Sequence, residues 1–133
     1  MIILKPLDLR DIEWARILRN KYKKYFDDKE ISQTDQNRWY KRYIYKKNYE
    51  FYVIVKDDKN IGTVSLLVTD KYVKIGDLIT EVEDTNLFKE IIEEIDKKYK
   101  CPYMLDMTEN NSYLLKIIQK MGFITKVISL YKK

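Results

Sequence analysis

The sequence predicts an α/β fold in which one mixed central sheet carries helices on both faces. Segments rich in β-branched and aromatic residues alternate with segments of helical periodicity, in the order β-α-α-β-β-β-α-β-α-β. The three central strands follow one another across short turns, which predicts an antiparallel meander. A long amphipathic segment then leads to the next strand, which predicts a right-handed parallel crossover.

The chain begins with a short predicted strand and a helix. The strand is expected at Ile2 to Lys5. Asp8 can cap a helix that runs to about Asn20, and Asp11 would lie near the positive end of the helix dipole. The spacing predicts that the buried stripe of this helix comprises Ile12, Ala15 and Leu18.

The second predicted helix follows a polar and aromatic segment, residues 22–31, which is predicted to be a loop. Ser32 and Asp35 resemble a capping box with Asp in place of Glu, so the helix is expected to begin there. The helix carries three aromatic residues at helical spacing, namely Trp39, Tyr40 and Tyr43.

The meander is predicted from three apolar runs at 51–55, 61–68 and 72–82, with turns at 57–60 and 69–71. The last of these strands contains a glycine, Gly76. A glycine inside a strand indicates a bulge or a close backbone approach nearby.

The last third of the chain is predicted to contain two helices, each followed by a strand. The first helix is expected at 88–99, with a charged outer face, and its strand at 103–107. The second helix is expected at 114–121, with Gly122 in the left-handed position that ends it. Residues 123–131 are predicted to form the closing strand.

Composition excludes several classes of protein. The 133 residues suit a single domain, which we expect to span residues 1–133. No run of 18 apolar residues is present and the N-terminus lacks a leader pattern, so we expect a cytoplasmic protein without membrane association. The single Cys101 agrees with a reducing compartment. The absence of histidine excludes an imidazole base and disfavours a metal site.

Basic and aromatic residues alternate in two segments, Lys21–Tyr25 and Tyr40–Lys47, and the net charge is +5. Such segments can follow a phosphate backbone and stack on bases. They are also typical of solvated helix faces with half-buried Tyr rings. Because the net charge is modest, we expect nucleic acid not to be the main partner.

Several short segments along the chain carry a family resemblance when they are taken together. The opening segments are Leu4-Lys5-Pro6-Leu7 and the Arg19-Asn20 pair. The others are Lys29–Ser32, Arg38-Trp39-Tyr40, Ile61–Leu66, Ile75–Ile79, Glu109-Asn110-Asn111 and Lys120–Phe123. In order and spacing these segments resemble the GNAT (Gcn5-related N-acetyltransferase) superfamily, and its ribosomal-protein and amino-sugar branches in particular, over nearly the whole chain.

The resemblance implies that acetyl-CoA is the cofactor. In this family the pantetheine arm lies in a gap between the fourth and fifth strands, and the pyrophosphate rests on amides at the next helix's N-terminus. Carried over, the cofactor would follow Leu78, Ile79 and Thr80 and reach Thr85 and Asn86. Asn111 would match the family's Asn at the start of the last helix, or would be a plain helix cap.

The reaction that the resemblance implies is transfer of an acetyl group to a primary amine, on an amino sugar or a peptide N-terminus. Without histidine, the base would be Glu30, Asp77 or Glu81, acting through water, unless each is simply a solvated carboxylate. Tyr113 is the candidate proton donor or a packing residue. The candidates to line the acceptor pocket are Trp14, Asn20, Tyr25 and Trp39.

Three departures from the family pattern support an alternative, in which the chain keeps the fold as a binding or assembly module. The segment Val82–Leu87 has no glycine, and its Glu83 and Asp84 would each repel a phosphate by about 1 kcal/mol. Ile118 stands where many members have a proton-donating Tyr. We expect about one strand after Phe123 where the family has two, so the far wall of the pocket would be either lost or supplied by a homodimer partner. We therefore predict weak coenzyme binding and little turnover.

Overall fold

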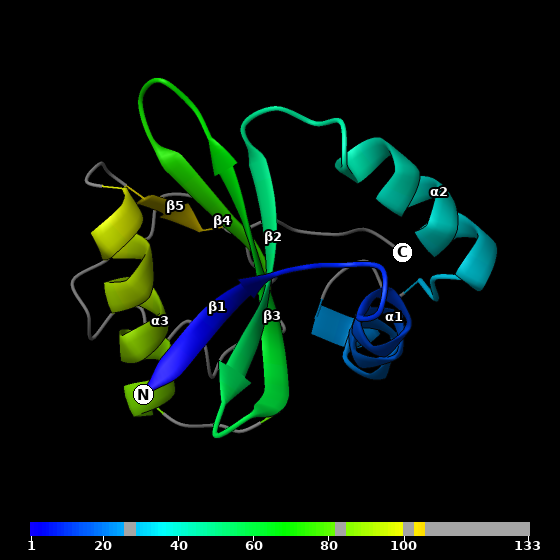
Figure 1. The fold of residues 1–133 in the computed structure, drawn as a ribbon, viewed down its shortest axis with the longest axis horizontal. Helices are drawn as coiled ribbons and strands as arrows, with labels where there is room; N and C mark the ends of the chain where they lie inside the picture. The colour runs from blue at the N-terminus through cyan, green and yellow to red at the C-terminus, as the bar shows by residue number, and fades with distance from the viewer. Residues whose placement is uncertain (26–28, 82–84, 100–102, 106–133) are drawn as a thin grey trace.

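A five-stranded sheet organises the chain, and helices cover both of its faces (Figure 1). The computed structural model describes residues 1–25, 29–81, 85–99 and 103–105. In chain order the elements are β1 Ile2–Pro6, α1 Ile12–Lys21, a 3-10 turn η1 Lys23–Tyr25, α2 Gln33–Tyr43, β2 Tyr49–Lys56, β3 Lys59–Val68, β4 Val73–Thr80, α3 Thr85–Lys98 and β5 Tyr103–Leu105. The predicted elements at 106–107, 114–121 and 123–131 lie outside the described residues.

The strand order β1-β2-β3-β4-β5 confirms the predicted topology. Strands β1 to β4 pair antiparallel with their neighbours, and β5 runs parallel to β4. The first tight turn leaves Asp57 and Asp58 between β2 and β3, with φ angles of 50° and 63°. Two residues at positive φ build the hairpin turn that matches the twist of antiparallel strands.

The two faces of the sheet carry separate cores. Helix α3 packs on one face, and α1 and α2 lie on the other (Figure 1). The α3 core is the larger, with Ile54, Val64, Leu66, Val73, Ile75, Leu87, Ile91 and Ile95 among its most buried members. The α1–α2 core contains Leu7, Ile12, Ala15, Phe51 and Val53. Strand β2 alternates between the two cores, as the side-chain period of a strand requires.

Helix α1 begins later than its sequence predicts, because Asp8 is used in a turn instead of a cap. The Asp8 carboxylate accepts a hydrogen bond from the Arg10 backbone N–H at 2.9 Å, and the Asp8 carbonyl accepts one from Asp11 N–H at 3.0 Å. The helix starts after Asp11, whose buried carboxylate pairs with Lys5 at 3.0 Å. The cap of α2 is as predicted, since Ser32 Oγ accepts from Asp35 N–H at 3.1 Å.

Of the two described glycines, Gly62 has the backbone of the neighbouring strand closest to it, and the sequence analysis did not single it out. A Cβ atom at Gly62 would lie 2.1 Å from the carbonyl oxygen of Ile79. At Gly76 the nearest neighbour would be the Ser65 hydroxyl at 3.0 Å, which belongs to a side chain. The bulge predicted near Gly76 is confirmed and lies at the next residue, as described below.

A polar cluster joins the end of α3 to the start of β2. Lys98 Nζ lies 2.8 Å from Glu50 Oε1, and the Tyr52 and Tyr99 hydroxyls donate to the same carboxylate. Burial raises the pKa of Glu50, but hydrogen bonds from Lys98, Tyr52 and Tyr99 outweigh it and hold that pKa below its usual value. Burial and the Glu50 charge raise the pKa of Tyr99 to about 12, so Tyr99 remains a donor at neutral pH.

Glu50→Gln is expected to lower the melting temperature at neutral pH and to lose this effect in acid. A carboxylate whose pKa is depressed by folding stabilises the protein above its unfolded pKa, and this stabilisation is lost as the pH falls through the folded pKa. Melting temperatures of the unaltered protein and of Glu50→Gln, measured from about pH 7 to about pH 3, should therefore converge as the pH falls. The exposed Glu93→Gln on α3 is the control. A gap of constant size at every pH would contradict this role of Glu50.

Candidate functional site

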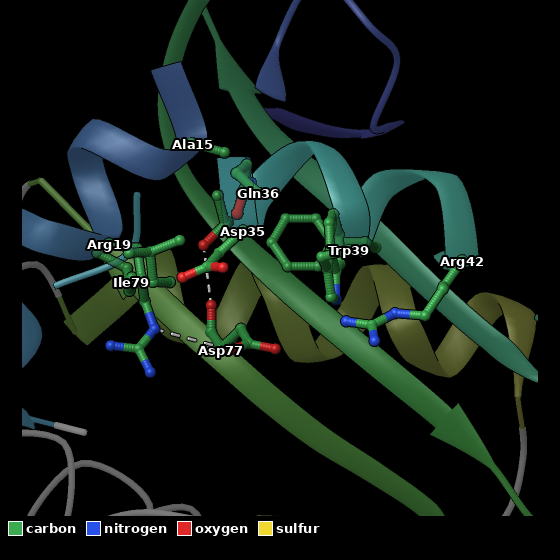
Figure 2. A pocket seen from close by; sticks show the side chains of 11 residues that line it. Ala15, Arg19, Asp35, Gln36, Trp39, Arg42, Asp77 and Ile79 are labelled. Atoms are coloured by element: carbon green, nitrogen blue, oxygen red, sulfur yellow. Dashed lines mark hydrogen bonds and ion pairs between the residues drawn. The ribbon is translucent and has the colours of Figure 1, made fainter. Parts of the chain in front are cut away.

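A cavity of about 290 Å³ lies between α1, α2 and the sheet. Its walls come from five elements and combine apolar, aromatic and charged side chains (Figure 2). They are Ala15, Arg19, Ile31, Asp35, Gln36, Trp39, Arg42, Phe51, Thr63, Asp77 and Ile79. A mostly apolar hollow with a few converging polar groups is the usual form of a small-molecule site.

A bulge in β4 turns Asp77 toward this cavity. Between the pairs Thr63↔Ile79 and Ser65↔Gly76, two residues of β4 oppose one residue of β3. Val73 and Ile75 belong to the α3 core, so strict alternation would also send residues 77 and 79 to that side. The extra residue shifts the phase, and both Asp77 and Ile79 line the cavity on the other side. Asp77 occupies this position with φ 48°.

The Asp77 carboxylate is held by three neighbours. Ser65 Oγ donates to Asp77 Oδ2 at 2.9 Å, and the Tyr49 hydroxyl lies 3.5 Å from the same atom. Arg19 Nε lies 4.0 Å from Asp77 Oδ1. Burial first, and the Asp77 charge second, raise the pKa of Tyr49, so its hydroxyl remains a neutral donor. Thr63 Oγ1 donates to the Asp77 carbonyl at 2.8 Å, which fixes the bulge itself.

A hydrogen-bonded loop residue, Ile31, forms another part of the wall. Asn20 donates to the Ile31 carbonyl at 2.9 Å and accepts from the Ile31 N–H at 2.7 Å. Arg16 donates to the same carbonyl at 3.1 Å. Asn20 therefore shapes the cavity through Ile31, and it is not itself among the lining residues.

Helix α2 presents Asp35, Trp39 and Arg42 to the cavity from consecutive turns. The Trp39 ring stacks on Tyr43 with centroids 5.1 Å apart and planes 4° apart. It also meets Phe51 edge-on at 5.3 Å. These contacts hold the indole in one orientation between the two charged side chains, as Figure 2 shows.

Beyond the bulge, β4 extends farther than its described pairing with β5. The pairing of β4 with β5 covers Val73, Lys74 and Ile75. Residues 76–80 continue along β3, past the part of β5 that the structure describes.

Solved structures of acetyltransferases are similar to this chain in overall fold. N-acetyltransferase PseH of Campylobacter jejuni, solved with acetyl coenzyme A, is 21% identical, and the match covers 96% of this chain and 91% of that one with a TM-score of 0.74. Spermidine N-acetyltransferase of Vibrio cholerae, solved with CoA and spermine, is 16% identical, with coverages of 95% and 82% and a TM-score of 0.78. The chain has a GNAT-like fold.

At these identities the similarity establishes the fold alone. A domain from Methanocaldococcus jannaschii DSM 2661 is as similar, with 16% identity, coverages of 95% and 90% and a TM-score of 0.74. No protein-family model matches the sequence, and no curated protein matches it. The predicted GNAT-like architecture is confirmed by these structures, whereas the particular branch of the superfamily is not tested by them.

The GNAT-like fold brings only some of the predicted site residues together. Asp77 and Ile79 line the cavity, as does Trp39. Leu78 packs toward the α3 core, and Thr80 pairs with Gly62 of β3. Trp14 packs in the α1–α2 core. Tyr25 ends the turn η1.

The other predicted residues lie elsewhere. Glu30 is exposed, and Glu81 is exposed and 4.0 Å from Lys21, so neither is among the cavity residues. Thr85 and Asn86 open α3, as predicted. Asn111, Tyr113, Ile118 and the segment 82–84 lie outside the described residues.

Sequence reasoning missed Arg19, Asp35 and Arg42 as cavity residues, and Ser65 and Tyr49 as supports of Asp77. Asp35 and Arg42 share the helical spacing of Trp39, which was the available signal. Within the part of the chain that the structure describes, no group of three acidic, His or Cys side chains is placed to hold a metal. None of the helices described there is long and apolar enough to cross a bilayer.

Proposed function

We propose that this GNAT-like chain transfers an acetyl group from acetyl-CoA to a primary amine bound in the cavity. The observation that carries the proposal is the position of Asp77, which the β4 bulge turns into the cavity. A carboxylate at this point can hold the ammonium form of an amine and can accept its proton. Asp77 is thus favoured over Glu30 and Glu81.

The coenzyme's pantetheine arm carries amide groups that can hydrogen-bond to a strand, and we place it along Leu78, Ile79 and Thr80. The described pairing of β4 with β5 ends at Ile75, before these residues. The N-terminus of α3 follows, and its first turn has no acidic side chain. Thr85 and Asn86 open this helix, and the positive end of its dipole would favour the pyrophosphate there. The carboxylates of Glu83 and Asp84 would oppose it.

Acetyl-CoA would supply the acetyl thioester. The chain would hold the amine next to it and provide a proton acceptor. The amine's ammonium proton would pass to Asp77, directly or through one water, leaving a neutral nitrogen that can form the new amide bond. Ser65 and Arg19 hold the carboxylate in place for this transfer. Apolar walls from Ile31, Phe51 and Ile79 would exclude water from the reacting groups. The products are an N-acetyl amide and the free thiol of coenzyme A.

The acceptor class follows from the resemblance, which implies an amino sugar or a peptide N-terminus. The Vibrio cholerae neighbour was solved with spermine, so polyamines are a third class to test. We further propose that residues 1–133 form one domain and that a second copy can complete the cavity wall.

Isothermal titration with acetyl-CoA over a salt series tests the proposal, together with release of free thiol in the presence of amines. Specific binding, competed by free coenzyme A, followed by thiol release is the expected result. Glu83→Gln with Asp84→Asn should strengthen binding, because it removes two charges from the phosphate site. Binding without any thiol release would favour the alternative of a binding module. Absence of binding would contradict the proposal.

A further inference from the structure

Two charged side chains on α2 face the cavity without a protein partner. Asp35 and Arg42 both line it. Among the residues that the structure describes, neither the Asp35 carboxylate nor the Arg42 guanidinium has an ion pair or a hydrogen bond. The other two charges in the cavity, Arg19 and Asp77, lie 4.0 Å apart and offset each other in part. The cavity therefore offers one negative and one positive group to a ligand.

The helix fixes the separation of these two groups. Asp35 and Arg42 are seven residues apart, which corresponds to about 10 Å along the axis and nearly two turns. They share a face with Trp39, whose indole lies between them (Figure 2). One face of that ring is taken by Tyr43, and the ring also lines the cavity. A ligand lying along α2 would meet a carboxylate, a flat apolar surface and a guanidinium in that order.

We propose that the cavity selects an amphoteric acceptor, with an ammonium group at Asp35 and Asp77, a flat or apolar middle against Trp39, and a carboxylate or phosphate at Arg42. The inference rests on the proposed acetyl transfer, because it specifies which amine is used. An extended tripeptide spans about 10 Å and fits this spacing with its free N- and C-termini. A polyamine would place a cation against Arg42, which disfavours it.

Calorimetric titration at low salt, without acetyl-CoA, tests the inference with two matched pairs of ligands. The first pair is the tripeptide Gly-Phe-Gly and its C-terminal amide, and the second is tyramine phosphate and tyramine. A hydrogen-bonded charge contributes about 1.5 kcal/mol, so in at least one pair the ligand with the carboxylate or phosphate should bind roughly tenfold more tightly than its partner, which keeps the ammonium group but lacks the anionic one. The pair with the larger ratio identifies carboxylate or phosphate as the preferred group.

Substitutions in α2 test whether the preference for a ligand with an anionic group depends on Arg42. Arg42→Gln should abolish the preference for the anionic ligand, and Arg42→Lys should retain part of it. Arg38 is on the same helix but does not line the cavity, so Arg38→Gln should leave the preference for the anionic group intact. Asp35→Asn should weaken the binding of all four amines. Circular dichroism confirms that each variant is folded.

Several outcomes would overturn the inference. With the unaltered protein, these are equal affinities within both pairs or no binding of any of the four ligands. With the variants, they are a preference for the anionic group that is lost as fully in Arg38→Gln as in Arg42→Gln, or one that folded Arg42→Gln retains in full. The proposed function fails separately, if acetyl-CoA neither binds nor donates its acetyl group. In that case a measured preference for amphoteric amines would still assign the cavity as their binding site.

Discussion

Asp77→Asn should reduce the rate of acetyl transfer by roughly 10²- to 10⁴-fold, the usual effect of losing a general base. The amide has the shape of the carboxylate and can still accept the hydrogen bond from Ser65. Asparagine also tolerates the positive φ of 48° at this position, so the bulge should persist. Steady-state thiol release measures the loss, and the melting temperature and acetyl-CoA affinity should change little.

The chain offers a matched control in Glu81→Gln. Glu81 was an equal candidate on sequence grounds, but it is exposed, pairs with Lys21 at 4.0 Å and does not line the cavity. Its replacement should change the transfer rate less than about twofold, since surface charges act weakly. Full activity in folded Asp77→Asn, or an equal loss in Glu81→Gln, would show that Asp77 is not the base.

Gly62→Ala should destabilise the domain by about 1–3 kcal/mol or more, because a methyl group has no room there. The added Cβ would lie 2.1 Å from the Ile79 carbonyl oxygen, and that oxygen belongs to the backbone of β4. Relief of the clash requires a shift of β4 against β3, beside the bulge that carries Asp77. The midpoint of denaturant unfolding measures the effect.

Gly76→Ala is the matched comparison in the same sheet. Its Cβ would meet the Ser65 hydroxyl at 3.0 Å, a contact that a side chain can relax more easily than a backbone can. The expected loss is therefore smaller than at Gly62, although the contact could weaken the hydrogen bond from Ser65 to Asp77. Equal losses of unfolding free energy in Gly62→Ala and Gly76→Ala would mean that β3 and β4 are farther apart at Gly62 than described.

Local patterns predict most of this fold because its strands and helices are continuous and their connections short. The runs around Val53, Val64 and Ile75 have strand composition and are buried as expected. The parallel pairing of β5 follows from the long connection through α3. The start of α1 was misplaced since Asp8 had two local uses, a cap and a turn, and both are consistent with its sequence.

The cavity is harder to predict because it depends on which face each side chain occupies. A glycine at position 76 suggested a bulge, but the register with β3 decides that Asp77 faces α1 and α2. Similarly, helical spacing groups Asp35, Trp39 and Arg42 on one side of α2 but does not show what lies opposite them. The support of Asp77 by Tyr49 and Ser65 joins residues of three strands, which no local pattern contains.

Because two residues of β4 oppose one residue of β3, the carboxylate at position 77 is in effect an insertion into an otherwise regular strand. Removing that single codon would join Gly76 directly to Leu78 and restore plain alternation. Leu78 would still face α3, and Ile79 would still face the cavity. A change of one codon can thus add or delete the acid while both hydrophobic layers persist. If Asp77 is the proposed proton acceptor, that small step would remove the acceptor without disturbing the fold.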